Sequence, residues 1–581
     1  MRHLLVLPCF ILVSLPRVYA QNDAAENQSS APTLRSTTHA VVVDVVVTNS
    51  KDDSISALHQ QDFVVNENGK PQTIDFFEEH TDANAPVATL PTLPPHVYSN
   101  QPFATPNDAV NIFLLDSLNT TEADQARIHK QILEFLSRKN PDTRIAIFAL
   151  NARLRMLQGF TADSTLLKAA INSKAAMPGT NVASRSRDDD LSDQMAIASA
   201  GSAAASQSMA RSLGEYSGTQ ATRRVASTFE ALQQLVRALG AIPGRKNVLW
   251  FASSFPVAVF PNEISRSNME DRREIPATLR QTVDLLTAGK VAIYPISAQG
   301  ILVDPTTDVD SGIGSSGVNA SQSYAQYAAA NNADTAAMEK LATGTGGKAI
   351  YSTNNLSQAL AHDIANGEHY YTLTYTPTDS KPDGKFRRID VRLAQGNYKL
   401  AYRRGYFADD ASTLTQTKPA ADPLAPLLAH GIPSSTQIVY QVRVLPSATQ
   451  PPPGAPRAGG NTKLPGQLKR YKVEFVISAA GLSLEPLPNG AHTAKIEVAL
   501  VAYGRDGAAV NWTGGSMTMT LNAASYAKAQ QTGIAAPMEI DLPDTDVSLA
   551  TGIYDLSARK AGTLEIPLSP AALAPTAPGS N

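Results

Sequence analysis

A loop near residue 118 carries the first side chains whose types could do chemistry. The apolar run Ile112 to Leu115 ends there and is followed by Asp116, Ser117, Asn119 and Thr120. A short apolar run of this kind predicts a central strand covered by helices on both faces. Open α/β sheets bind ligands at the carboxyl ends of such strands. The pattern therefore predicts small oxygen-bearing groups in a ligand-binding crevice.

The segment after this loop has the pattern of a helix. Thr121 and Asp124 have the spacing of a capping box, which satisfies the first free N–H groups of a helix. Apolar residues then recur on one face at Ile128, Ile132, Phe135 and Leu136. We expect a helix that starts directly beside the acidic loop.

The strand, loop and helix together resemble the opening of a von Willebrand factor A domain, whose metal-ion-dependent adhesion site begins with Asp-x-Ser-x-Ser. Asp116 keeps the aspartate, Leu118 replaces the first serine, and Thr120 replaces the second serine but keeps a hydroxyl. In this family a later Gly-Thr supplies another ligand, and Thr180 is the corresponding residue. Ser254 stands where the family usually has an aspartate.

The resemblance implies a weakened metal site made of Asp116, Thr120, Thr180 and Ser254. Mg²⁺ favours a shell of hard oxygens with one or two carboxylates. These four side chains could hold Mg²⁺ or Mn²⁺, but a single negative charge predicts weak binding. The alternative is that no cofactor binds and that Asp116 only caps the following helix.

Catalytic patterns are missing from the sequence. The ten histidines are scattered without the His-Glu-x-x-His spacing of a zinc protease, and there is no Gly-x-Ser-x-Gly elbow. Ser117 beside Asp116 is the best hydrolytic arrangement, but His129 lies about two and a half turns along the next helix. We therefore predict no catalytic residues and a protein that is not an enzyme, and a hydrolase is the least favoured alternative.

Residues 108–367 alternate apolar runs with helical patterns, which predicts a doubly wound α/β domain of the von Willebrand A or Rossmann-like kind. The expected strands are Asn111 to Leu115, Arg144 to Leu150, Leu154 to Phe160, Asn247 to Ala252 and Val291 to Ile296. Residues 182–222 are rich in Ser, Ala and Gly and predict a disordered or loosely helical insertion, or a mobile lid beside the site. The glycine run Gly344 to Gly347 lacks a following Lys-Ser/Thr and predicts a turn.

Two β modules flank this domain. Residues 37–80 contain a valine-rich strand and a hairpin signal at Asn68-Gly69, and residues 368–409 predict a three-stranded antiparallel extension. The text ALHQQDFVVNENGKPQTIDFFEE, a Tyr-Tyr strand and Arg404-Gly405-Tyr406 resemble the VWFA-related domain family known mainly from acidobacterial genomes. The basic side chains of the extension could bind an acidic partner or lipid, but the favoured interpretation is a solvated sheet face.

The C-terminal part predicts a β-sandwich over residues 434–568, because several β-rich runs are separated by turn signals. Residues 85–107 and 411–433 are expected to be linkers, the first rich in proline. Residues 569–581 are rich in Ala and Pro and predict a tail.

The N-terminus has the layout of a secretory signal peptide over residues 1–20, with cleavage after Ala20 and a flexible tether over residues 21–36. The only cysteine, Cys9, lies inside it, so disulfides and zinc–thiolate sites are not expected after cleavage. A net charge of -3 gives no basic footprint for nucleic acid. No later run reaches about twenty apolar residues, which predicts a periplasmic or secreted protein without a transmembrane segment.

These observations favour an exported, non-enzymatic interaction or adhesion protein. Its partner would be an unidentified protein or an extracellular matrix or envelope component, bound through the face that carries Asp116. The alternative is an envelope scaffold in which the α/β domain is structural, no metal binds, and the β modules mediate assembly.

Overall fold

A five-stranded sheet forms the centre of the α/β domain, and its strand order in the computed structural model is β10-β9-β6-β7-β8. The strands are β6 (Val110–Asp116), β7 (Ile145–Leu150), β8 (Leu154–Thr161), β9 (Lys246–Ala252) and β10 (Val291–Ser297). All are parallel except β8, which pairs antiparallel with β7 at one edge. The chain moves outward from β6 to one side and then crosses to β9 on the other, as in the predicted doubly wound fold.

The structure describes most of the chain after residue 39, and all the described residues belong to one compact unit. They are residues 40–81, 93–101, 109–151, 153–174, 176, 203–242, 244–255, 282, 285–299, 332, 334–353, 355–408, 422–447, 457–464 and 467–569. The predicted signal peptide, tether and tail lie outside the described residues, as does Thr180.

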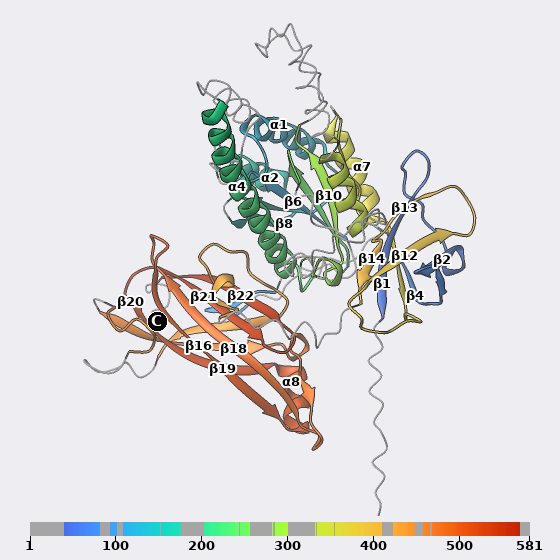
Figure 1. The fold of residues 1–581 in the computed structure, drawn as a ribbon. Helices are drawn as coiled ribbons and strands as arrows, with labels where there is room; N and C mark the ends of the chain where they lie inside the picture. The colour runs from blue at the N-terminus through green and yellow to red at the C-terminus, as the bar shows by residue number, and fades with distance from the viewer. Residues whose placement is uncertain are drawn as a thin grey trace, which may run out of the picture. The chain divides into compact units, whose positions relative to one another are not determined.

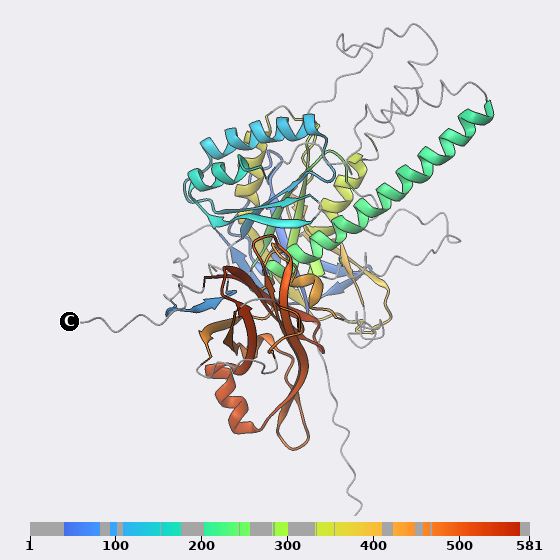
Figure 2. The same cartoon turned by 90° about the vertical axis from the view of Figure 1, so that its left-hand side faces the viewer.

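Helices cover both faces of the sheet (Figures 1 and 2). On one face α1 (Glu122–Arg138), α2 (Ser164–Ile171) and α7 (Leu356–Glu368) share a core with Phe113 and Leu115 of β6. On the other face α4 (Ala203–Ala238) and the helix over residues 334–345 share a core with Ile112 and Leu114. Successive residues of a strand point to opposite faces, so burial on both faces explains why β6 is apolar throughout.

The predicted insertion over residues 182–222 is partly corrected by α4. This helix begins at residue 203, so the second half of the segment is helical and continuous with the helix expected after it. Disorder is therefore the wrong description for residues 203–222. Residues 177–202 lie outside the described residues, and the interpretation as a lid stays a prediction.

The two predicted β modules form one domain. One sheet has the order β13-β1-β11-β4 and the other the order β14-β12-β2-β3. The strands are β1 (Val41–Thr48), β2 (Phe63–Glu67), β3 (Lys70–Gln72), β4 (Ile74–His80), β11 (Tyr370–Tyr375), β12 (Phe386–Leu393), β13 (Lys399–Ala401) and β14 (Gly405–Phe407). The predicted three-stranded extension is thus wrong as a single sheet, because β11 and β13 pair with β1 whereas β12 pairs with β2.

The hairpin predicted at Asn68-Gly69 is confirmed for β2 and β3. Both turn residues have positive φ, 48° for Asn68 and 81° for Gly69, which the tight turns of two-residue hairpins require. The hairpin strand after the turn, β3, is only three residues long, and the chain then continues into β4, which pairs with β11 in the other sheet.

The C-terminal part contains two sheets that share one core. The first has the order β20-β16-β15-β5, and the second has the order β17-β18-β21-β22 with β19 on β18. The strands are β5 (Val97–Ser99), β15 (Tyr440–Pro446), β16 (Leu468–Ile477), β17 (Glu485–Pro486), β18 (His492–Tyr503), β19 (Ala509–Leu521), β20 (Ile534–Pro543), β21 (Val547–Asp555) and β22 (Lys560–Leu568). Helix α8 (Ala523–Thr532) was not predicted.

Both predicted linkers contribute ordered structure to this part. β5 lies inside the Pro-rich segment 85–107 and pairs with β15. In the second segment a 3-10 helix covers Ala425–Leu427, and its neighbours Leu424 and Leu428 pack against Ala550. Among the described residues, no helix has the length and apolar character needed to cross a membrane.

Candidate functional site at the carboxyl ends of the strands

Asp116 lies at the carboxyl end of β6, where the sequence predicts a ligand-binding crevice, but its side chain is buried and hydrogen-bonded within the protein. Its Oδ2 accepts hydrogen bonds from Trp250 Nε1 at 2.9 Å and from Asn119 Nδ2 at 2.7 Å. Its Oδ1 accepts one from Asn119 N at 3.0 Å. Burial outweighs these bonds and raises the pKa of Asp116 to about 6.

Thr120 and Thr121 both serve the loop and the start of α1. The Thr120 hydroxyl donates to the main-chain carbonyl of Asp116. Thr121 is the N-cap of α1, and its side chain accepts from Asp124 N. The capping role predicted for Thr121 is therefore confirmed. The alternative in which Asp116 caps the helix is wrong, because its carboxylate bonds Asn119 and Trp250.

The loop after β9 is tied to the loop after β6. Ser253 N and Ser254 N both donate to the Asn119 carbonyl, at 3.1 and 3.2 Å. The Ser253 hydroxyl donates to Asp124 Oδ2 at 2.7 Å, and Gln299 Nε2 donates to the Ser253 carbonyl at 3.0 Å. Three loops thus meet in one hydrogen-bonded network around Asp116.

The described members of the predicted metal site do not fit a cation in this arrangement. The structure brings Asp116, Thr120 and Ser254 to the same edge of the sheet, but N–H donors point at both carboxylate oxygens. A cation would have to displace Trp250 Nε1 and the Asn119 donors before it reached Asp116. The part of the chain that the structure describes contains no group of three or more His, Cys, Asp or Glu side chains that could hold a metal.

Ser117 and His129 do not form a catalytic pair. The Ser117 hydroxyl donates to the Leu150 carbonyl at 3.1 Å and to Asn151 Oδ1 at 3.0 Å. His129 Nε2 instead contacts Asn172 Oδ1 at 3.0 Å. Each side chain therefore bonds a different neighbour, and neither is available to activate the other.

Sequence reasoning missed two residues of this edge. Trp250 looked like an ordinary core residue of an apolar strand, and no sequence signal reveals that its N–H faces Asp116. Asp334 accepts a hydrogen bond from the main chain of Phe255, and burial raises its pKa to about 6. The Phe255 ring packs edge-on against Trp250 with centroids 5.2 Å apart. Asp334 thus adds a further carboxyl group to this end of the domain, besides Asp116 and Asp124.

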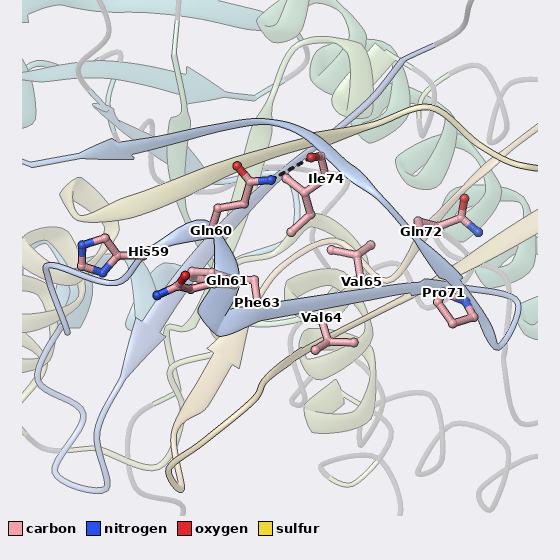
Figure 3. Close-up of a pocket in the computed structure, with 9 residues that line it drawn as sticks. All are labelled: His59, Gln60, Gln61, Phe63, Val64, Val65, Pro71, Gln72 and Ile74. Carbon is pink, nitrogen blue, oxygen red and sulfur yellow. Dashed lines mark hydrogen bonds between the residues drawn. The ribbon is translucent and has the colours of Figure 1, made fainter.

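A separate groove of about 660 Å³ lies on the β domain beside β2 and β4 (Figure 3). Apolar side chains and amides make up most of its lining, and Gln60 Nε2 donates to the Ile74 carbonyl at 2.9 Å. His59 is the one titratable residue among those that line it. The groove is open and nearly neutral, so its lining does not favour one class of ligand.

Comparisons with known proteins find solved structures with a partly similar fold but no protein with a similar sequence. No family model matches the chain, and the search of curated proteins finds no match. A von Willebrand factor type A structure from Catenulispora acidiphila is 10% identical, with 59% of this chain and 75% of that chain covered and a TM-score of 0.23. An aerotolerance-related membrane protein from Bacteroides fragilis is 9% identical, with 44% and 98% covered and a TM-score of 0.23.

A third similar structure is proximal thread matrix protein 1 from the mussel byssus, described as having a zinc-occupied metal-ion-dependent adhesion site. It is 11% identical, with 46% of this chain and 47% of that chain covered and a TM-score of 0.21. TM-scores this low give no information about the function of this chain. The doubly wound assignment rests on the strand order of the sheet, and the narrower resemblance to the VWFA-related family stays a prediction.

Proposed function

We propose that this chain is an exported, non-enzymatic interaction protein that presents the carboxyl-end edge of its α/β sheet to another protein or to an envelope or matrix component. The network around Asp116 is the observation that supports this most directly. At this edge the side chains of Asp116, Ser117, Thr120, Asp124 and Ser253 are used in internal hydrogen bonds. A rigid edge of this kind suits docking better than chemistry.

Among the described residues, the start of α1 exposes side chains at this edge. Glu122, Ala123 and Arg127 are exposed there. Arg127 is held in place, because its Nη1 donates to Asp124 Oδ1 and to the Gln299 carbonyl, both at 2.7 Å. The surface offers one anionic and one cationic side chain on a helix whose start is fixed by Thr121, a pattern that supports a polar, complementary partner.

Binding by this surface does not require a metal in our proposal. The competing version is a weak Mg²⁺ or Mn²⁺ site at Asp116, which requires the Trp250 and Asn119 donors to move away. Isothermal calorimetry of Mg²⁺ and Mn²⁺ into the mature protein separates the two versions. We expect no binding heat. Heat that disappears in Asp116→Ala would favour the metal-dependent version.

A charge reversal on α1 tests the docking surface itself. Glu122→Lys changes the exposed first turn, and Glu134→Lys makes the same change at an exposed position three turns further along the same helix. We expect Glu122→Lys to reduce capture of envelope or matrix components by the mature protein at least several-fold, with Glu134→Lys close to wild type.

Circular dichroism melting of both variants checks that each remains folded. Glu122 lies at the positive end of the helix dipole, so its reversal should cost only about 0.5 kcal/mol. Equal capture by wild type and both variants would argue against this docking surface. It would favour the alternative of a scaffold that assembles through its β modules.

A further inference from the structure

The opposite edge of the same sheet, where β9 and β10 begin, contains a small cavity lined by cationic side chains. Arg245 precedes β9, Lys290 precedes β10, and Arg403 follows β13 of the β domain; all three line the cavity. Asp44 of β1 is the one carboxylate among the lining residues. The cavity has a volume of about 30 Å³, which is room for a water molecule or a small ion.

One guanidinium nitrogen of Arg403 has no hydrogen-bond acceptor among the described residues. Its Nη2 donates to the Val42 carbonyl at 2.6 Å. Its Nη1 is buried and has no hydrogen-bond partner in the part of the chain that the structure describes. The guanidinium carbon lies 5.8 Å from the centre of the Tyr406 ring, which favours the charge but does not accept a directed hydrogen bond at Nη1. A buried charged donor left unpaired is costly, so an acceptor at this position would be stabilising.

Arg245 is a buried cation that donates hydrogen bonds to three neutral acceptors. It is 2% exposed. Its Nε donates to Asn247 Oδ1 at 3.1 Å, and its Nη2 donates to the Tyr294 hydroxyl at 3.3 Å and to the Gly346 carbonyl. These bonds use Nε and Nη2, and none of the three acceptors carries a charge that would offset that of Arg245.

Two lysines add to the positive charge. Lys290 has a left-handed backbone, with φ of 51°, a conformation that costs energy for a residue with a Cβ and is often found at functional positions. Its neighbour Lys246 is 4% exposed. Burial, and then repulsion from Lys290, lower the pKa of Lys246 to about 8. Four cations therefore lie near one carboxylate, Asp44.

The glycine run at residues 344–347 makes this convergence possible. Gly344 and Thr345 line the cavity. Gly346 has φ of 81°, and a Cβ at this residue would lie 2.9 Å from the Arg403 main-chain nitrogen. A side chain at Gly346 would thus push Arg403 away from Arg245. The turn predicted from the sequence is present, and it also packs against the end of the β domain.

We propose that this cavity binds a small inorganic anion of about the size of chloride. The anion would accept a hydrogen bond from Arg403 Nη1 and would offset the charges of Arg245 and Lys290. These residues adjoin β9, β10 and β13, so the bound anion would also fasten the β domain to the amino-end edge of the α/β sheet.

Chloride titration of the mature chain tests this proposal. Chloride replaces gluconate, which is too large for the cavity, at constant ionic strength, while ³⁵Cl line width and melting temperature are followed. We expect both to change saturably for wild type. Arg403→Met should weaken the apparent affinity about tenfold or more, because a charged hydrogen bond is lost.

Lys70→Met is the matched control, because it removes one positive charge from an exposed position of β3 in the same domain. We expect it to respond to chloride like wild type. If Arg403→Met does not fold, as judged by circular dichroism, Lys290→Met takes its place. The same response in wild type and in the site variant, or no saturable response in wild type, would overturn the proposal. A response to phosphate but not to chloride would overturn the assigned size of the anion.

Discussion

Buried charged side chains have different surroundings at the carboxyl ends and at the amino ends of the central strands. At the carboxyl-end edge, the Asp116 carboxylate is buried but accepts three N–H hydrogen bonds. At the amino-end edge, Arg403 has a buried nitrogen without a partner, and Arg245 is buried against neutral acceptors. At the first edge the buried carboxylate has a donor on each oxygen, whereas at the second edge one carboxylate, Asp44, lies among several cations.

This difference indicates at which end of the strands a bound ligand would stabilise the protein. Topology places ligands of doubly wound sheets at the carboxyl ends of the strands. At that edge Asp116 bonds its neighbours, Gln125 Oε1 is a buried acceptor without a partner among the described residues, and the start of α1 is exposed. At the amino-end edge the unpartnered buried group is a charged donor, Arg403 Nη1, which points to a small anion there. The fold alone therefore does not indicate the proposed anion site at the amino ends of the strands.

The largest expected effect on stability comes from removing the Asp116 carboxylate at the carboxyl-end edge. Asp116→Ala leaves Trp250 Nε1 and the Asn119 donors buried without an acceptor, and we expect it to lower the free energy of unfolding by about 4 kcal/mol at pH 7. Urea unfolding followed by Trp250 fluorescence, in a Trp512→Phe background, measures it. A loss under about 1 kcal/mol would mean that the network is not the stabilising feature described above.

The pH dependence of stability should show a smaller but distinct effect at the same edge. The pKa of Asp116 is raised from 3.8 to about 6 in the folded protein, so between these values the folded state holds a proton that the unfolded state has lost. Its contribution to stability is therefore fully present below about pH 4 and is lost as the pH rises to about 6. The change should be about 3 kcal/mol.

Urea unfolding of wild type and Asp116→Asn from pH 4 to pH 7 isolates this contribution. Asp334, whose pKa is also raised to about 6, is present in both proteins and cancels in the difference. A difference in unfolding free energy that stays constant across this range would contradict a raised pKa at Asp116.

The smallest effect on stability is expected at the amino-end edge. Arg403→Met removes a guanidinium whose Nη1 is buried without a partner among the described residues, and replacing a buried charge by an apolar side chain of similar size is often neutral or stabilising. In gluconate buffer without chloride, we expect a change within about 1 kcal/mol. Saturating chloride should make the same substitution clearly destabilising. A large loss without chloride would show that Arg403 is already satisfied, and the contrast between the edges would disappear.

Local patterns predicted the elements of the α/β domain well. The apolar run before Asp116 became β6, and the edge strand expected over Leu154 to Phe160 became β8. The predicted Thr121 cap and the Asn68-Gly69 turn are present. Each of these depends on side chains within a few residues of each other, which is the range over which hydrophobic periodicity, capping and turn preferences act.

Pairing between distant segments was beyond the sequence patterns. The strands β11, β12 and β13 look like one antiparallel sheet in sequence, yet they are divided between two sheets by pairing with β1 and β2, about 330 residues away. The alternation of apolar and polar residues tells which face of a strand is buried but not which strand lies beside it. β5 was missed for the same reason, because three residues gain a partner only in the folded chain.

The sequence by itself determined the oxygen-rich loop, the strand before it and the capped helix after it, because these are local consequences of residue type. Only the tertiary structure decided what Asp116 does. Trp250 and Asn119 occupy its oxygens because β9 lies beside β6, and burial there costs a charge unless donors meet it. The same packing gathers Arg245, Lys290 and Arg403 from segments with no relation in sequence. A cluster of this kind exists only once the sheet and the β domain have come together.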